Sequence, residues 1–157
     1  MKVFLDIDGV MVHANPTRTV EFDNDGFYKF NRSAVEALKN ICFDKLSIEL
    51  ILSTSHRFRY TLQEWREIFF YRGIEIEKIS RIETQINYKL SRKNEILNWI
   101  EECHYKIDNL IIIDDDKSLN GLPAKLKERL ILTNPYIGLN QSLINETTIV
   151  NHSSSVK

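Results

Sequence analysis

Lys2-Val-Phe-Leu-Asp-Ile-Asp-Gly-Val10 is the stretch of sequence that decides the fold. Its apolar run, residues 3–7, is nearly continuous, which is typical of a strand buried on both faces of a parallel sheet. Two carboxylates, Asp6 and Asp8, stand at the end of this run, and Gly9 permits a sharp turn directly after them. A buried strand that ends in acidic residues predicts an α/β fold with polar groups at one edge of its sheet.

Further apolar runs repeat this pattern along the chain, and segments with helical spacing of apolar residues lie between them. Strands that alternate with helices predict right-handed crossovers and a three-layer, Rossmann-like α/β fold with a mainly parallel five-stranded sheet. The expected strands are 3–7, 48–52, 74–79, 110–113 and 130–133, and the expected helices are 33–43, 62–71, 92 to about 104, 122–128 and a last one that starts near 139.

Length and composition favour one globular domain. The 157 residues suit a single domain over 1–150, followed by a polar tail, 151–157, that we expect to be flexible. A net charge of -1 gives no general basic excess for binding nucleic acid and leaves only a local basic patch open. No apolar run approaches the roughly 18 residues of a membrane span. Two cysteines without zinc spacing and an opening unlike a signal peptide indicate a reducing cytoplasm.

The polar residues that end the apolar runs are expected to meet at one edge of the sheet, because open parallel sheets bind ligands at the carboxyl ends of their strands. Carboxylates packed together repel one another unless a cation neutralises them, and oxygen ligands suit Mg²⁺. The sequence therefore predicts a Mg²⁺ site at this edge. The residues concerned are Asp6 and Asp8 after the first run, Ser53, Thr54 and Ser55 after the second, Asp114, Asp115 and Asp116 after the fourth, and Arg92 and Lys93 at the start of the preceding helix.

Four ordered motifs carry a resemblance to a known family. They are Asp6-Ile-Asp-Gly-Val10, Leu52-Ser-Thr-Ser55, a basic residue that opens a helix, and Ile113-Asp-Asp115. Their order and spacing resemble the motifs of the haloacid dehalogenase (HAD) superfamily. The longer stretches Ser53-Thr-Ser-His-Arg57, Arg92-Lys-Asn-Glu-Ile-Leu-Asn-Trp-Ile100, Ile113-Asp-Asp-Asp116 and Leu132-Thr-Asn-Pro-Tyr-Ile-Gly-Leu139 are similar to the small HAD domains of RNA-repair-associated proteins.

The chain departs from those domains at two places. His56 stands where tryptophan is common, and Lys93 stands where glycine is common. The second departure bears on the basic residue of the third motif. Lys93 has the usual residue type and Arg92 matches the register of the RNA-repair relatives, so both stay open.

The resemblance implies a phosphatase that works through an aspartyl-phosphate. Asp6 would attack phosphorus, and Asp8 would protonate the leaving oxygen and then activate water. Thr54 would hydrogen-bond the transferring phosphoryl group, with Ser53 or Ser55 as weaker candidates. Arg92 or Lys93 would pair with the nucleophile and the phosphate, and Mg²⁺ would be held by Asp6, the backbone carbonyl of Asp8, and Asp115 supported by Asp114, although either of the last two could be the direct ligand.

Little room is left for a cap domain. Roughly 20 residues separate Gly9 from the first expected helix, and most of 58–87 is taken up by one helix and one strand. A site that is nearly capless suits a phosphate on a large partner, such as a nucleic-acid end or a protein. A small-molecule or nucleotide phosphatase and a non-catalytic phosphate-binding module are the alternatives. Gly9 is expected at the substrate, whereas His56 and Arg57 either line the pocket and contact substrate or lie on the surface.

Other polar and aromatic residues are expected to have structural roles. Asn24-Asp25-Gly26 predicts a turn between extended pieces 20–22 and 27–30, which would form a small flap. Trp65 and Trp99 occupy helical apolar positions and are expected in the core. The remaining histidines, His13, His104 and His152, have no metal-ligand spacing and are expected to face solvent.

Overall fold

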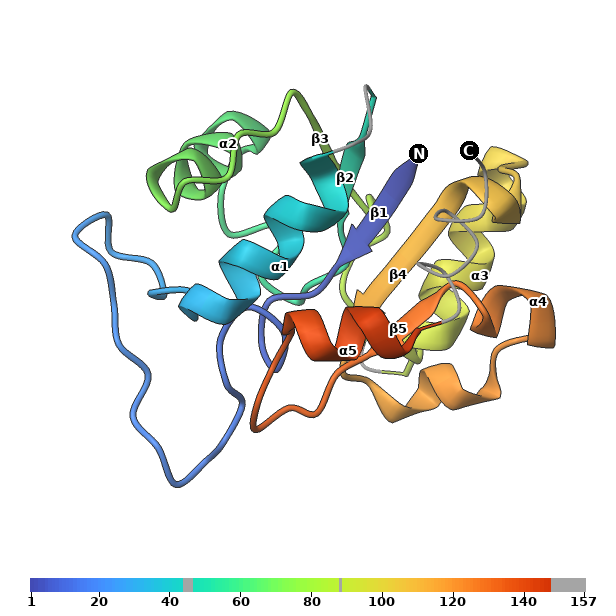
Figure 1. Cartoon of the computed structure of the whole chain (residues 1–157). Coiled ribbons are helices and arrows are strands. Elements are labelled where there is room, and N and C mark those ends of the chain that lie inside the picture. Colours follow the sequence, from blue (N-terminus) through green and yellow to red (C-terminus); the bar gives the residue numbers. More distant parts are fainter. Residues whose placement is uncertain (44–46, 88, 148–157) are drawn as a thin grey trace.

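The computed structural model describes residues 1–43, 47–87 and 89–147. Its centre is a sheet of five parallel strands in the order β3-β2-β1-β4-β5, so that the strand directly before Asp6 lies in the middle (Figure 1). This architecture confirms the predicted α/β fold. The strands are β1 (Lys2–Leu5), β2 (Glu49–Leu52), β3 (Lys78–Arg81), β4 (Leu110–Asp114) and β5 (Leu130–Leu132).

Helices cover both faces of the sheet and complete the three layers. Alternate residues of β1 face different cores: Val3 and Leu5 pack in the first, and Phe4 packs in the second. The helices that pack in the first core are α1 (Arg32–Phe43), α2 (Leu62–Tyr71) and α5 (Gln141–Glu146). Those that pack in the second are α3 (Arg92–Cys103), α4 (Ala124–Lys127) and the 3₁₀ helix η2 (Lys117–Gly121). A 3₁₀ turn, η1 (Ile107–Asn109), precedes β4.

Both tryptophans pack as expected. Trp65 of α2 is fully buried in the first core, where its ring nitrogen donates a hydrogen bond to the carbonyl oxygen of Arg57 at 3.2 Å. Trp99 of α3 packs edge-on against Phe4, with ring centroids 5.0 Å apart. Each tryptophan therefore fastens a helix to one face of the sheet.

The third strand begins later than the sequence predicts. Ile74 and Ile76 are buried in the first core, as their apolar spacing suggests, but the ladder with β2 begins only at Lys78, which pairs with Glu49. The apolar pattern indicates which residues are buried, and residues before the start of the β2–β3 pairing are buried as well. The expected strand over 74–79 is therefore wrong at its start. The helix expected from residue 122 begins at Ala124, directly after Pro123.

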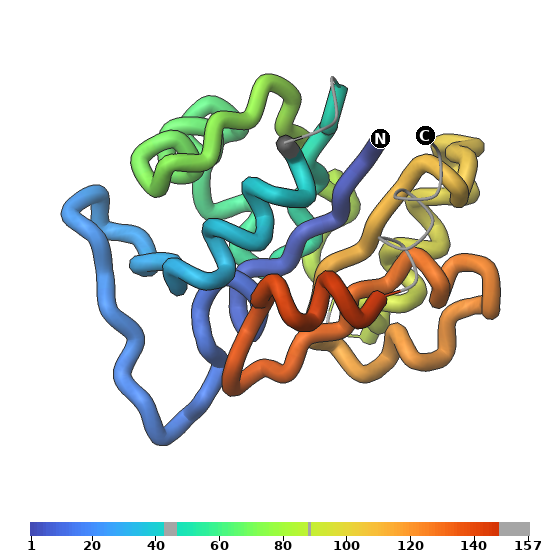
Figure 2. The backbone as a smooth tube through the Cα atoms, in the orientation of Figure 1, coloured from blue at the N-terminus to red at the C-terminus, as the bar shows by residue number. Residues whose placement is uncertain are grey.

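The flap, defined here as residues 20–30, is a short hairpin in the long loop between β1 and α1, which reaches away from the sheet (Figure 2). A single antiparallel bridge joins Phe22 to Tyr28, and Gly26 in the turn has a φ of +85°. Arg72, at the end of α2, clamps the turn through Asp25, with Nη–Oδ distances of 2.6 and 2.8 Å. The predicted flap is thus present and fastened to α2.

Several expectations fall outside this description. The predicted tail, 151–157, with its histidine at position 152, lies outside the described residues, and the domain limit at residue 150 stays a prediction. Within the described part of the chain, no helix has the length and apolar character needed to cross a membrane.

Candidate active site

The register of the sheet brings three strand ends together. Leu5 pairs with Leu52 of β2 and with Ile113 of β4. The backbone N–H of Asp6 donates to the carbonyl of Ile113 at 3.1 Å, and that of Ser53 donates to the carbonyl of Leu5 at 3.1 Å. The residues that follow these strands therefore lie at one edge, which we call the catalytic edge: the carboxyl ends of β1, β2 and β4.

Three carboxylates converge at the catalytic edge. Oxygens of Asp6, Asp114 and Asp115 all lie within 4.8 Å of one another. Burial raises the pKa of Asp6 to about 7, and the negative charge of Asp115 adds to this effect. Burial likewise raises the pKa of Asp114 to about 8, and there the charge of Asp6 adds to it. The pKa of Asp115 rises to about 6 because of burial and the charge of Asp114. The ionised cluster thus needs a positive partner.

The donor set fits a hard divalent cation. All three side chains offer carboxylate oxygen, the ligand type that Mg²⁺ prefers. Oδ2 of Asp114 is buried and receives no hydrogen bond from the residues that the structure describes. The backbone at Gly9 makes room for this set, since its φ is +79° and a Cβ there would overlap Oδ2 of Asp115. Gly9 therefore packs against an acid of the cluster, and its expected contact with substrate stays a prediction.

The side chain of Arg92 reaches the cluster. Its Nη2 lies 3.8 Å from Oδ1 of Asp6, and its Nε lies 3.4 Å from Oδ2 of Asp114. Ser91 caps the helix by accepting a hydrogen bond from the N–H of Asn94 at 3.2 Å, which sets Arg92 as the first residue of α3. Arg92 therefore has the geometry expected of the third-motif residue.

Lys93 turns elsewhere. Its side chain runs beside η2, where Nζ would lie 3.4 Å from a Cβ built on Gly121. Its backbone N–H donates to Oγ of Ser118 at 3.2 Å. Neighbouring positions on a helix point about 100° apart, so only one of Arg92 and Lys93 faces the acids.

The loop after β2 places its hydroxyl groups differently. Thr54 is buried beside the end of β1, and its Oγ1 accepts a hydrogen bond from the N–H of His56 at 3.2 Å. Ser53 is fully buried and its Oγ makes no hydrogen bond within the described residues, whereas Ser55 is exposed. Nε2 of His56 lies 2.8 Å from Oδ2 of Asp8. His56 thus contacts the expected acid–base residue.

Arg57 neither lines the pocket nor lies on the surface. It is 1% exposed, and its Nε and Nη2 donate to the carbonyl oxygens of Ile82 at 2.9 Å and Thr84 at 2.8 Å. Both expectations for Arg57 are wrong, because the loop after β3 supplies acceptors that no pattern near residue 57 could reveal.

Sequence reasoning missed Glu95, which is buried on α3. Its Oε2 lies 3.5 Å from Nη1 of Arg57 and 4.0 Å from Nη1 of Arg92. A signal existed: Glu95 stands three residues after Arg92 and directly before the buried Ile96, so it lies close to the apolar side of α3.

Two polar residues outside the cluster are structural. Asp116 caps η2, since its Oδ1 accepts a hydrogen bond from the N–H of Ser118 at 2.8 Å. His13, expected to face solvent, is 7% exposed. Its ring nitrogens contact the N–H of Asn15 at 3.2 Å and the carbonyl of Thr19 at 3.3 Å, so the fold of its own loop buries it. His104 is exposed, as expected.

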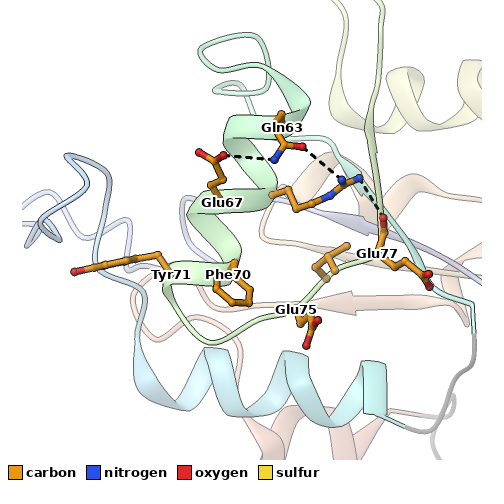
Figure 3. A pocket seen from close by; sticks show the side chains of 8 residues that line it. Gln63, Glu67, Phe70, Tyr71, Glu75 and Glu77 are labelled. Atoms are coloured by element: carbon orange, nitrogen blue, oxygen red, sulfur yellow. Dashed lines mark hydrogen bonds between the residues drawn. The ribbon is translucent and has the colours of Figure 1, made fainter.

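A cavity of about 900 Å³ lies away from these residues, between α2 and the segment that leads into β3 (Figure 3). Arg66 bridges its wall by donating to Gln63 and to the carbonyl of Glu77. None of the predicted site residues lines it. Its lining residues are Gln63, Arg66, Glu67, Phe70, Tyr71, Glu75, Ile76 and Glu77.

Comparison with known proteins adds one family. The model of the family described as "HAD domain in Swiss Army Knife RNA repair proteins" matches residues 2–144, which include every predicted site residue. A search of curated proteins gave no match. The matched family and the cluster of aspartates together support phosphatase or related hydrolase chemistry.

Proposed function

The chain belongs to the family of HAD domains in Swiss Army Knife RNA repair proteins, and from this premise we propose that it is a Mg²⁺-dependent phosphatase that works through an aspartyl-phosphate. One observation carries the proposal: the carboxylates of Asp6, Asp114 and Asp115 converge beside the guanidinium of Arg92. A phosphate monoester is an anion, and positive charge at this edge is what would let it approach a carboxylate nucleophile.

Asp6 is the nucleophile of the proposed reaction. Its carboxylate lies at the end of the central strand, and its backbone is hydrogen-bonded into the sheet through Ile113, which fixes its position. Mg²⁺, held by Asp6, the carbonyl of Asp8 and Asp115 with Asp114 in support, would supply the charge that screens phosphate from the nucleophile. Arg92 contributes the permanent positive charge and two-pronged hydrogen bonding to phosphate oxygens.

Asp8 is the general acid and base. Its side chain is 42% exposed, compared with 7% for Asp6, so it stands toward solvent, where a leaving group departs and water enters. In the first step it gives a proton to the leaving oxygen, and in the second it takes one from the attacking water. Thr54, buried beside β1, is the proposed hydrogen-bond donor to the phosphoryl group.

The proposed substrate is a terminal phosphate on a polynucleotide. The family's description refers to RNA repair, and within the described residues the connections around the catalytic edge form a small flap and no cap domain. A phosphatase without a cap can accept the end of a large molecule. The expected cytoplasmic location stays a prediction.

The direct test is release of phosphate from p-nitrophenyl phosphate and from a phosphorylated oligonucleotide. We expect activity that needs Mg²⁺, stops with chelator and is lost in Asp6→Asn. Asp108→Asn is the matched control, because Asp108 is exposed in η1, which precedes β4. Full activity of Asp6→Asn would sink the proposed nucleophile. Tight binding of the oligonucleotide with no turnover would favour a phosphate-binding module instead, and a much higher kcat/KM for a mononucleotide would favour a small-molecule phosphatase.

A further inference from the structure

Asp8 receives its hydrogen bond from a neighbouring loop. Nε2 of His56, in the loop after β2, lies 2.8 Å from Oδ2 of Asp8, and the side chains are 22% and 42% exposed. Among the described residues, no hydrogen bond reaches the other oxygen, Oδ1. One oxygen of the carboxyl group is therefore held, and the other is left to exchange a proton.

The ring of His56 is itself fixed from two sides. Its backbone N–H is bonded to Thr54, and its ring packs edge-on against Phe27 and Tyr28, with centroids 6.1 and 5.6 Å away. Those two rings belong to the flap, which Arg72 fastens to α2. The side chain that makes the hydrogen bond to Asp8 therefore has little freedom to move.

We infer that His56 is a positioning residue for Asp8: it holds Oδ2 so that Oδ1 is directed at the oxygen that leaves phosphorus. This inference rests on the proposed function. In the first step the bond between Asp6 and phosphorus forms, the bond from phosphorus to the leaving oxygen breaks, and that oxygen takes the proton from Oδ1. In the second step water attacks phosphorus, the bond to Asp6 breaks, and Oδ1 takes the proton from water.

The choice of leaving group tests this role. p-Nitrophenolate is a good leaving group that needs little protonation, whereas an alkoxide needs it strongly, so a loss of proton transfer falls mainly on alkyl esters. His56→Phe keeps an aromatic ring against Phe27 and Tyr28 but removes the hydrogen bond. We expect kcat/KM for glycerol phosphate to fall by about 10- to 100-fold, and that for p-nitrophenyl phosphate by less than about 3-fold.

His56→Gln is the matched variant, because its amide can donate to Asp8 without the ring. It should recover most of the activity on glycerol phosphate. Thermal midpoints show whether each variant folds, and His56→Met repeats the comparison if the phenyl ring is not accommodated.

A double-mutant cycle tests whether His56 acts through Asp8. In an Asp8→Asn background, adding His56→Phe should cause no further loss. Equal losses of His56→Phe on both esters, or a full additional loss in Asp8→Asn, would overturn the positioning role and leave the phosphatase proposal standing. A wild-type protein that hydrolyses neither these esters nor the phosphorylated oligonucleotide with Mg²⁺ would overturn both.

Discussion

Arg57 and Arg92 share one carboxylate, Glu95, yet their guanidinium groups are used in different ways. Every nitrogen of Arg57 donates to a backbone carbonyl oxygen, with acceptors in the loops after β2 and β3. Arg92 faces carboxylates instead, and its buried Nη1 makes no hydrogen bond within the described residues.

The difference teaches what makes a buried arginine structural or functional. The guanidinium of Arg57 is buried and joins two loops, so a substrate cannot reach it. Arg92 has donors and charge left at the catalytic edge, where a phosphate would arrive. Glu95 is paired with both arginines. Substitutions of Arg57, Arg92 and Glu95 should therefore differ in how much they lower stability and how much they lower activity.

The largest expected effect is on stability. Arg57→Ala leaves Glu95 without its nearer arginine and removes the guanidinium that donates to four carbonyl oxygens, so we expect the free energy of unfolding to fall by about 3–5 kcal/mol. Urea denaturation measures it. Arg59→Ala is the control, since Arg59 is exposed and its loss should cost less than about 1 kcal/mol. Similar losses of stability in Arg57→Ala and Arg59→Ala would show that Arg57 has no special structural role.

Arg92→Ala should reduce kcat/KM for phosphate esters by about 10²- to 10³-fold, because a charge aimed at the transferring phosphoryl group is lost. Arg92→Lys should recover part of the activity, since lysine offers a charge without the planar fork. Steady-state kinetics with saturating Mg²⁺ measure both. Lys93→Ala serves as the control because Lys93 lies along η2. A greater loss in Lys93→Ala would assign the basic role to Lys93.

The acids that Arg92 faces predict a pH dependence of stability without metal. Burial raises the pKa of Asp6 to about 7 and that of Asp114 to about 8, from 3.8. A pKa above the unfolded value means that the folded state binds protons more tightly, so the free energy of unfolding falls as pH rises through these values. In chelator, we expect the loss between about pH 5 and about pH 8.5 to exceed the roughly 1.4 kcal/mol that corresponds to one pKa unit.

Thermal denaturation with added Mg²⁺, and of the variant Asp114→Asn, checks whether these carboxylates cause the pH dependence. Mg²⁺ should raise Tm more at high pH, because the cation binds the ionised carboxylates. Asp114→Asn, which cannot ionise, should flatten the profile. A thermal midpoint in chelator that rises with pH in this range would contradict the raised pKa values.

The smallest expected effect belongs to the shared carboxylate. Glu95→Gln keeps the shape of the side chain but leaves two arginines facing a neutral amide, so we expect a loss of about 1 kcal/mol in the free energy of unfolding and a decrease of only a few-fold in kcat/KM. Glu101→Gln, exposed on the same helix, is the control. No change in either quantity would show that Glu95 does not couple the two arginines.

Local pattern was sufficient to find the acids of the site. The apolar runs before Asp6 and Asp114 end where the strands end, or within a residue of it, and parallel strands present these ends at one edge. The same logic brought Thr54 and Ser53 to the edge, but it could not tell that Ser53 would be enclosed and Ser55 exposed. Those differences depend on what the following loop packs against.

The sequence pattern could not predict contacts between residues far apart in the chain. The choice between Arg92 and Lys93 depends on the rotation of α3, which the cap at Ser91 and the packing of Ile96 set. The place of Arg57 depends on carbonyls near residues 82 and 84, far away in the sequence.

The sequence by itself determined which strands end in polar residues, the acidic cluster and the family motifs, because these follow from short apolar runs and the residues directly after them. Only the tertiary structure decided which polar side chains meet: Arg92 with Asp6, Arg57 with Glu95, and His56 with Asp8. The physical reason is that hydrogen bonds and ion pairs need atoms within a few ångströms, and helix rotation and loop packing, which no local pattern records, set those distances.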